Sequence, residues 1–307
     1  MANRWWVPAA AAAAVVVIGA GSVLVLRKDG GGPAAAPTPV STLEQLRVRN
    51  GDMVTASGTV VVAPGKPPRF CAPAPVAGVG TTGPEQPPDC SLGVDLVGVD
   101  AARLTGVKTF ATTRWGQAGI TGRYAGGTVT VTAQDAPVAT PGPDLLADLP
   151  DGPPCPAPDG GWRPGPIGES RGLSAFVHSH PTAYGEIVMT YPDGRPTGDE
   201  ATTEVLLVTT TMPVAVAEKE LRAHYTGNLC VRPAGRSRAE VDAVWTRVAF
   251  DRQAVRHGAY SGGPDHFLGR VRVQLMVLDD AAYGWLSGAA EPGGPAVEAD
   301  PWLRPVR

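Results

Sequence analysis

Alternating polar and apolar residues dominate the first half of the chain. Residues 53–62 read Met-Val-Thr-Ala-Ser-Gly-Thr-Val-Val-Val, residues 92–99 have the same character, and residues 128–133 alternate strictly as Thr-Val-Thr-Val-Thr-Ala. Because successive side chains of a strand point to opposite faces, this period of two predicts strands. Gly126-Gly127, directly before the last run, favours a hairpin turn.

The glycine-rich stretch at residues 116–131 resembles the closing hairpin of OB-like barrels. It reads Gly-Gln-Ala-Gly-Ile-Thr-Gly-Arg-Tyr-Ala-Gly-Gly-Thr-Val-Thr-Val. Glycines at these positions allow strands to bend sharply where a small barrel closes. The resemblance implies that residues 43–136 form an all-β, OB-like domain.

The second half of the chain mixes strand and helix periods. Strands are predicted at residues 173–177, 186–191, 204–211, 229–231 and 271–278, and helices at residues 216–225 and 280–286. The clearest helix begins at Ser237-Arg-Ala-Glu240, a capping box, and continues with valines at helical spacing. This order predicts an α+β domain at residues 169–307.

Residues 5–26 form the longest uncharged run. As a helix they would extend roughly 33 Å, enough to span a bilayer. We therefore expect a tail at residues 1–4 and a single-pass transmembrane anchor at residues 5–26, with the lipid bilayer as its partner. A cleaved signal peptide is the alternative, because Arg4 suits its charged start.

Proline and glycine concentrate in two further segments. Residues 27–42 read as a spacer that begins with Arg-Lys-Asp-Gly-Gly-Gly-Pro, and residues 137–168 as a linker between domains. The expected fold class is therefore a transmembrane helix plus an all-β OB-like barrel domain plus an α+β domain.

The four cysteines bear on the compartment. Cys71, Cys90, Cys155 and Cys230 form no Cys-x-x-Cys motif, which argues against a zinc ribbon or a thioredoxin-type site. Their placement predicts the disulfides Cys71–Cys90 and Cys155–Cys230, and disulfides persist in oxidising compartments. We therefore expect a protein of the cell membrane with the bulk of its chain extracytoplasmic; four unrelated buried thiols are the alternative.

Charge narrows the range of partners. The formal net charge is −3 and charged residues make up 18% of the chain. Binding of duplex nucleic acid depends on clustered Lys and Arg, and no strongly basic stretch occurs here. We therefore expect no nucleic acid as a partner.

His178-Ser179-His180-Pro181 is the sharpest candidate for chemistry. On a strand, two imidazoles two residues apart share a face and can bind one zinc ion. The motif resembles that of JAMM-type metalloproteases, but Val188 and Tyr191 occupy the positions of that family's Ser and Asp. A metal-dependent hydrolase using His178 and His180 is thus the alternative function, whereas our main expectation has no metal, no cofactor and no catalytic residue.

Three aromatic residues suggest a binding face. Phe110, Trp115 and Tyr124 fall in the OB-like segment, and OB-like barrels bind oligonucleotides or oligosaccharides on one face. Outside the cell, an envelope protein or a glycan is the expected ligand. The alternative is that these rings form the core and the closing turn of the barrel.

The last 100 residues carry a second resemblance. The segments Tyr-Thr-Gly-Asn-Leu-Cys-Val at residues 225–231, Ser-Arg-Ala-Glu at 237–240 and Trp-Leu-Arg-Pro-Val at 302–306 are similar to uncharacterised single-pass membrane-anchored proteins of high-GC Gram-positive bacteria. The resemblance assigns no activity. The sequence as a whole predicts a membrane-anchored extracytoplasmic module for binding or assembly at the cell envelope, and an enzyme is the less favoured interpretation.

Overall fold

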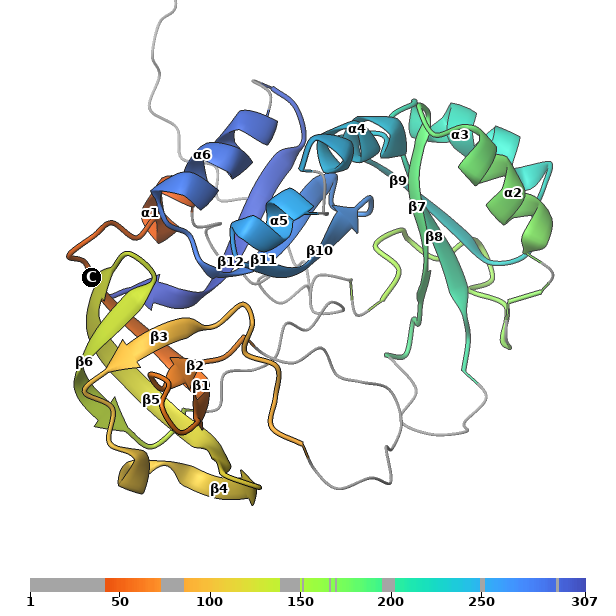
Figure 1. Ribbon diagram of the computed structural model, residues 1–307. Helices are drawn as coiled ribbons and strands as arrows, with labels where there is room; N and C mark the ends of the chain where they lie inside the picture. Colours follow the sequence, from red (N-terminus) through yellow and green to blue (C-terminus); the bar gives the residue numbers. More distant parts are fainter. Residues whose placement is uncertain are drawn as a thin grey trace, which may run out of the picture. The chain divides into compact units, whose positions relative to one another are not determined.

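The protein is described here from a computed structural model (Figure 1). Its chain separates into two units, Met1–Val40 and Ser41–Arg307, and the description concerns the second. The described residues are 42–72, 86–138, 150, 152–165, 167–168, 170–194, 202–248, 252–290 and 293–307.

A nine-stranded sheet has the order β10-β11-β12-β1-β2-β3-β6-β5-β4. Its first part comes from β1 (Met53–Val62), β2 (Arg69–Phe70), β3 (Val94–Val97), β4 (Thr105–Phe110), β5 (Thr113–Ala125) and β6 (Thr128–Asp135). A further pairing between β1 and β5 closes β1, β2, β3, β6 and β5 into a ring. Closure of this kind leaves the five strands with few free edges.

The ring is filled by the apolar positions of the alternating strands. Val54, Val60, Phe70, Leu96 and Ile120 are at most 2% exposed and belong to one core cluster. Intervening residues of the same strands point outward, so the period of two seen in the sequence separates the core from the surface.

Three C-terminal strands extend the sheet beyond the ring (Figure 1). β10 (Ala259–Asp265) pairs antiparallel with β11 (Arg270–Val277), and β11 pairs in parallel with β12 (Ala296–Pro305). β12 then pairs antiparallel with β1, with Val54 opposite Pro305. The C-terminal strand therefore joins the ring to the remainder of the sheet.

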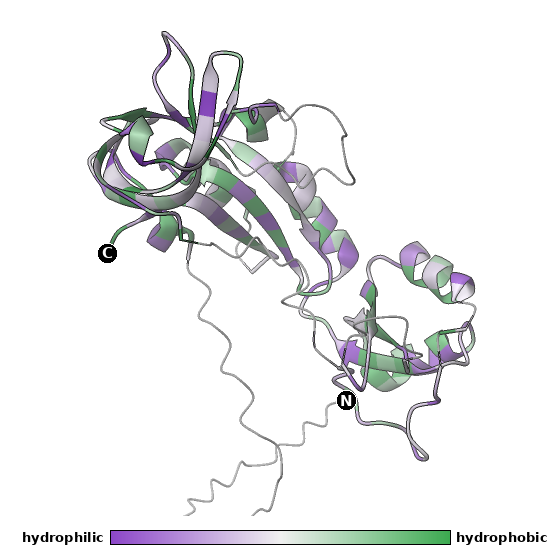
Figure 2. Cartoon of the chain, turned by 90° about the horizontal axis from the view of Figure 1, so that it is seen from below, coloured by the Kyte–Doolittle hydropathy of each residue, from purple (hydrophilic) through white to green (hydrophobic). Residues whose placement is uncertain are grey.

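Helices cover one face of β10, β11 and β12. They are α4 (Arg238–Val248), α5 (Arg252–Arg256) and α6 (Asp280–Ala289), and α1 (Leu43–Leu46) lies beside α6. Val271, Val273 and Leu275 of β11 are fully buried against these helices. The alternate residues of β11 face the other way, and this alternation is visible in Figure 2.

A second sheet has three strands, in the order β7-β8-β9. They are β7 (Tyr184–Thr190), β8 (Val205–Thr210) and β9 (Leu229–Pro233), with α2 (Arg171–Ser179) and α3 (Val214–Arg222) packed on one face. Phe267 and Trp162 pack on the opposite face. Because both faces are covered, all six residues of β8 are buried, which explains its continuous run Val-Leu-Leu-Val-Thr-Thr.

The predicted fold class is wrong. The described chain is a β-rich α+β structure whose large sheet takes strands from both predicted domains, 43–136 and 169–307, through the pairing of β1 with β12. Within the described ranges no helix is both long enough and apolar enough to span a bilayer. The predicted tail, the anchor at 5–26 and residues 27–41 of the spacer lie outside those ranges.

Two local predictions have opposite outcomes. The capping box is confirmed, because the Ser237 backbone N–H donates to Glu240 Oε2 at 2.8 Å and the Glu240 N–H donates to Ser237 Oγ at 3.3 Å. The strand predicted at residues 173–177 is instead helix α2. Its buried residues Leu173 and Val177 are four apart, which is the helical spacing.

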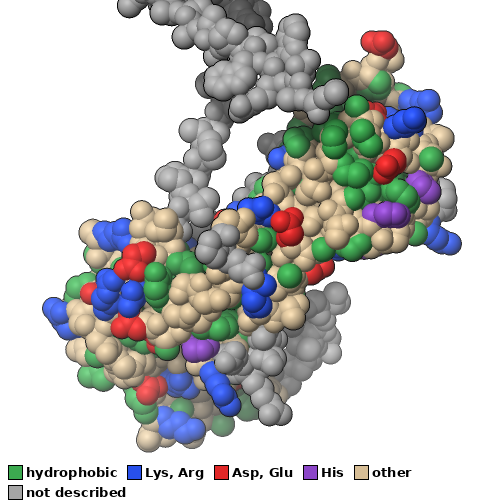
Figure 3. All heavy atoms as spheres, turned by 90° about the horizontal axis from the view of Figure 1, so that it is seen from above, with side chains coloured by type: hydrophobic (Ala, Val, Ile, Leu, Met, Phe, Trp, Pro, Cys, Tyr) green, Lys and Arg blue, Asp and Glu red, His purple; other side chains and the backbone are tan. Residues whose placement is uncertain are grey.

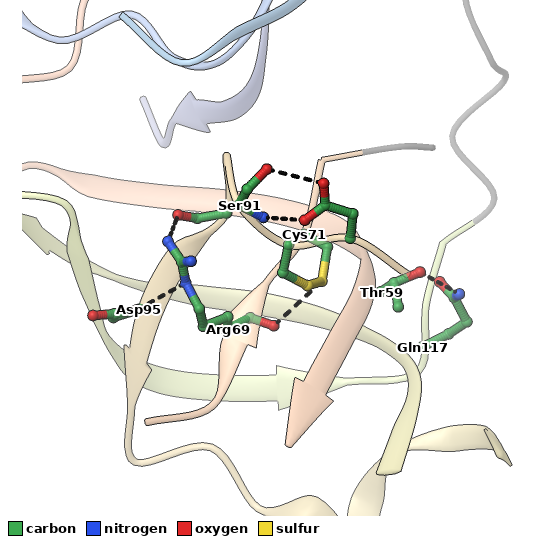
Figure 4. Close-up of a disulfide and its surroundings, with 9 residues drawn as sticks. Thr59, Arg69, Cys71, Ser91, Asp95 and Gln117 are labelled. Atoms are coloured by element: carbon green, nitrogen blue, oxygen red, sulfur yellow. Dashed lines mark hydrogen bonds and ion pairs between the residues drawn. A yellow bond between two sulfur atoms is a disulfide. The ribbon is translucent and has the colours of Figure 1, made fainter. Parts of the chain in front are cut away.

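The structure contains two disulfides, Cys71–Cys90 and Cys155–Cys230, which are the pairs expected from the sequence. Cys71 follows β2 directly, and Figure 4 shows it beside the ion pair between Arg69 Nε and Asp95 Oδ1, 3.0 Å apart. The second disulfide ties the segment before α2 to β9.

Replacing Leu303 tests the joining role of β12. Leu303 is fully buried in the core of the ring, so we expect Leu303→Ala to lower the free energy of unfolding by about 2–5 kcal/mol. Urea denaturation followed by far-UV and near-UV circular dichroism measures the change. Val306→Ala, at a half-exposed position just beyond β12, is the control and should cost far less. A free energy of unfolding left unchanged by Leu303→Ala would contradict the joining role of β12.

Candidate functional site

The face of β10–β12 that the helices do not cover is polar. In the parallel register Arg272 lies beside Glu298 and Gln274 beside Asp300, while Val273 lies beside Ala299 on the helical side. Paired residues of a ladder share a face, so these four polar side chains project together. We call this surface the polar face.

Ion pairs organise one end of the polar face. Arg270 Nε lies 3.1 Å from Asp265 Oδ2 and its Nη1 lies 2.8 Å from Glu298 Oε2. All three side chains are at most 22% exposed. Both carboxylates are thereby held by one guanidinium, which fixes the geometry of this end.

A groove lies where the polar face meets the outer surface of β1 and β5. It encloses about 310 Å³. The wall from the ring is formed by small and hydroxyl-bearing residues, and the wall from β10–β12 carries the larger polar and aromatic ones. The principal lining residues are Thr55, Ser57, Gly119, Thr121, Asp135, Val138, Tyr260, Gln274, Asp300, Trp302 and Arg304.

Trp302 reaches the ring because Gly58 has no side chain. A Cβ on Gly58 would lie 3.0 Å from Trp302 Nε1 and 3.2 Å from Phe70 Cζ, which is tighter than ordinary contact. The indole therefore packs against the core of the ring while it also lines the groove. Within the described part of the chain its Nε1 has no hydrogen-bond partner.

The Asp300 carboxylate lines the groove and is held by two hydrogen bonds. Arg304 Nη2 donates to its Oδ1 at 2.6 Å, and Gln274 Nε2 donates to its Oδ2 at 3.5 Å. Burial, and then the nearby Asp300 carboxylate, raise the pKa of Tyr260. Tyr260 thus keeps its phenolic proton at neutral pH and can act as a donor.

A second cavity of about 360 Å³ adjoins the groove, and Gln274 lines both. Its notable member is His266, in the turn between β10 and β11. His266 Nδ1 lies 3.3 Å from Glu186 Oε2 on β7, and Nε2 lies 2.7 Å from Asp242 Oδ1 on α4. Arg238 Nη2 holds the other oxygen of Glu186 at 3.0 Å. The four side chains form what we call the His266 cluster.

Opposing effects set the protonation of the His266 cluster. Burial by itself would lower the pKa of His266, but its bonds to Glu186 and Asp242 outweigh burial and raise that pKa. Burial would raise the pKa of Glu186, but His266, the Ile187 backbone N–H and Arg238 together lower it. Both shifts favour the charged forms, an imidazolium paired with the Glu186 carboxylate.

Both ring nitrogens of His266 are occupied within the cluster. Each faces a carboxylate oxygen, so neither offers a lone pair to a substrate or a metal ion. The residues come from β7, α4 and the β10–β11 turn, so the cluster links the three-stranded sheet to the large sheet. Across the described residues, no group of three or more His, Cys, Asp or Glu side chains could hold a metal ion.

The predicted histidine pair is not on a strand. His178 lies in the last turn of helix α2, and His180 is the residue that caps the C-terminal end of this helix. His178 Nδ1 donates to the Ser174 carbonyl at 2.7 Å, and His180 Nδ1 donates to the Phe176 carbonyl at 2.8 Å. The shared face expected from a strand is therefore absent.

The three predicted aromatic residues do not form one exposed surface. Trp115 is 6% exposed and Tyr124 is 4% exposed, and the Tyr124 hydroxyl lies 3.5 Å from Asp279 Oδ2. Only Phe110, on β4, is exposed. Trp115 and Tyr124 are thus buried packing residues.

Neither the groove nor the His266 cluster is apparent from local sequence patterns. Glu186, Asp242 and His266 are separated by up to 80 residues, and sheet pairing alone brings Thr121 near Trp302. The only local signals are the polar alternation of residues 296–305 and the aromatic residue within it.

No protein-family model matches this chain. No curated protein matches it either. The site is therefore interpreted from its own geometry.

The His266 cluster predicts a dependence of stability on pH. Because the pKa of folded His266 is raised above 6.5, its stabilising contribution is complete below about pH 6.5 and is lost as pH rises through the folded pKa. His266→Gln should therefore cost about 1–3 kcal/mol at pH 6 and clearly less at pH 9. Urea denaturation across this range measures the difference, with the exposed His178→Gln as control. An equal cost of His266→Gln at both pH values would contradict the prediction.

Proposed function

We propose that this protein is a non-enzymatic binding module that acts outside the cytoplasm, in binding or assembly at the cell envelope. The observation that carries the proposal is the groove between the outer surface of β1–β5 and the polar face, with its two aromatic and several polar lining residues. Concave sites that combine apolar rings with a few oriented polar groups are typical of ligand binding.

The two disulfides support the compartment in this proposal. The structure has no free cysteine among the described residues, and the two disulfides join residues 19 and 75 apart in sequence. Disulfides of this kind persist in oxidising surroundings and are rare in the cytoplasm.

Surface charge fits a ligand other than nucleic acid. On the face drawn in Figure 3, basic and acidic side chains lie among one another, without a large area of one sign. Nucleic-acid sites require a concentration of positive charge. The metal-dependent hydrolase is not favoured, because His178 and His180 lie at the end of a helix and the Nδ1 of each ring is bonded to a backbone carbonyl.

Site-specific photo-crosslinking tests binding through the groove. Val138 lines the groove and is 73% exposed, so a benzophenone amino acid fits there without disturbing the core. Irradiation of native-host cells should give an adduct of increased mass. Val216 on α3, 48% exposed and distant from the groove lining, is the matched control and should give none. Equal yields at the two positions, or no adduct at either, would overturn the proposal.

Thiol labelling tests the compartment. With native protein released from cells without reductant and denatured, a maleimide mass tag should label no cysteine, because all four are paired. After reduction the same protein should carry four tags. Tags present before reduction in protein from its native host would place the chain in a reducing compartment.

A further inference from the structure

We infer that the groove binds an oligosaccharide built of neutral or amine-bearing pyranose units. The inference rests on the proposed function, since it names the class of ligand for the same site. Its basis is the joint placement of Trp302, Tyr260, Gln274 and Asp300 around one cavity of about 310 Å³.

The aromatic residues suit the apolar faces of sugar rings. Trp302 and Tyr260 line the same groove from neighbouring parts of the sheet, and neither is fully buried. Rigid aromatic side chains offer contact area at low cost in conformational entropy, and a pyranose presents flat patches of C–H groups that pack on them. The tight packing of Trp302 against Gly58 fixes the indole in advance of binding.

The polar residues suit hydroxyl groups. A sugar hydroxyl is both donor and acceptor, so a site for it needs both kinds of partner. Asp300 accepts one bond at each carboxylate oxygen from Arg304 and Gln274, which leaves further acceptor capacity on both oxygens. The Gln274 amide oxygen and the hydroxyls of Thr55, Ser57 and Thr121 add acceptors and donors around it.

Charge excludes other ligand classes. The lining includes the carboxylates of Asp135 and Asp300 but a single cation, Arg304, which is paired with Asp300. A phosphate, a nucleotide or an acidic sugar would meet net negative charge, whereas a neutral or cationic sugar would not.

The size of the groove bounds the length of the bound segment. A cavity of about 310 Å³ is at the lower limit of small-molecule sites, which span roughly 300–1,000 Å³. We therefore expect one or two sugar rings to be held directly, with the remaining rings of a longer chain outside the groove.

Titration calorimetry and saturation-transfer NMR with the full chain test the inference. The probes are chitotetraose, cellotetraose, mannotetraose and maltotetraose as neutral tetramers, chitosan tetramer as the amine-bearing one, and tetragalacturonate as the acidic one. We expect saturable binding of at least one neutral or amine-bearing probe and at least tenfold weaker binding of tetragalacturonate. Binding of tetragalacturonate with equal affinity would overturn the inference.

Matched variants locate the binding. Trp302→Phe and Gln274→Ala should each weaken binding fivefold or more, whereas Trp285→Phe, the same exchange on α6 outside the groove lining, should leave it within twofold. The urea midpoint of each variant establishes that it is folded. Binding that is insensitive to both groove variants would place the sugar elsewhere and overturn the inference.

Failure of this inference is distinguishable from failure of the proposed function. If no probe binds but the Val138 adduct forms, resists periodate and yields tryptic peptides of a second protein, the groove takes a protein and the binding module stands. If no probe binds and no adduct forms, both are wrong.

Discussion

The pairing of β12 on both of its sides is the constraint on which the rest of the structure depends. Its N-terminal part follows β11 in parallel from Ala296 to Leu303, and its end meets β1 at Arg304 and Pro305. Main-chain hydrogen bonds on both sides fix the strand in register, and a slip of one residue would exchange its two faces. Without this strand the ring and the helix-covered part of the sheet would share no ladder.

The alternation along β12 divides its side chains between the two cores and the polar face. Val297 and Leu303 are buried in two different cores, one beneath the helices and one in the ring. Glu298, Asp300 and Trp302 occupy the intervening positions and form part of the polar face. The same register that completes the two cores therefore sets the carboxylate and the indole side by side. The groove follows mainly from the joining of the two parts of the sheet, and the segment after β6 adds Val138 to its lining.

Sequence patterns predicted those elements whose conformation depends only on their own residues. The capping box at Ser237 and the strand at 53–62 needed only their own residues, and β1 begins and ends where the alternation does. Residues 173–177 were predicted as a strand, because a mainly apolar segment of five residues is too short to distinguish the helical period from the strand period. The packing of Leu173 and Val177, four residues apart, in the core beside β7–β9 favours a helix. Pairing of β1 with β12 joins residues about 250 apart, so no local pattern carries it, and the groove and the His266 cluster were hidden for the same reason.

Rigidity is the property that links the disulfides, the His266 cluster and the groove. The groove walls are ladder strands, so their polar groups are oriented before a ligand arrives, which reduces the entropy lost on binding. The elements beyond the groove are held by other interactions. The His266 cluster ties β7 to the β10–β11 turn. The disulfide Cys155–Cys230 ties a proline-rich segment to β9. Such segments bury too little apolar surface to order themselves, and a covalent link substitutes for the missing core. A chain rich in glycine and proline can therefore hold polar and aromatic side chains in a fixed arrangement, because the strands that carry most of them are paired in a ladder.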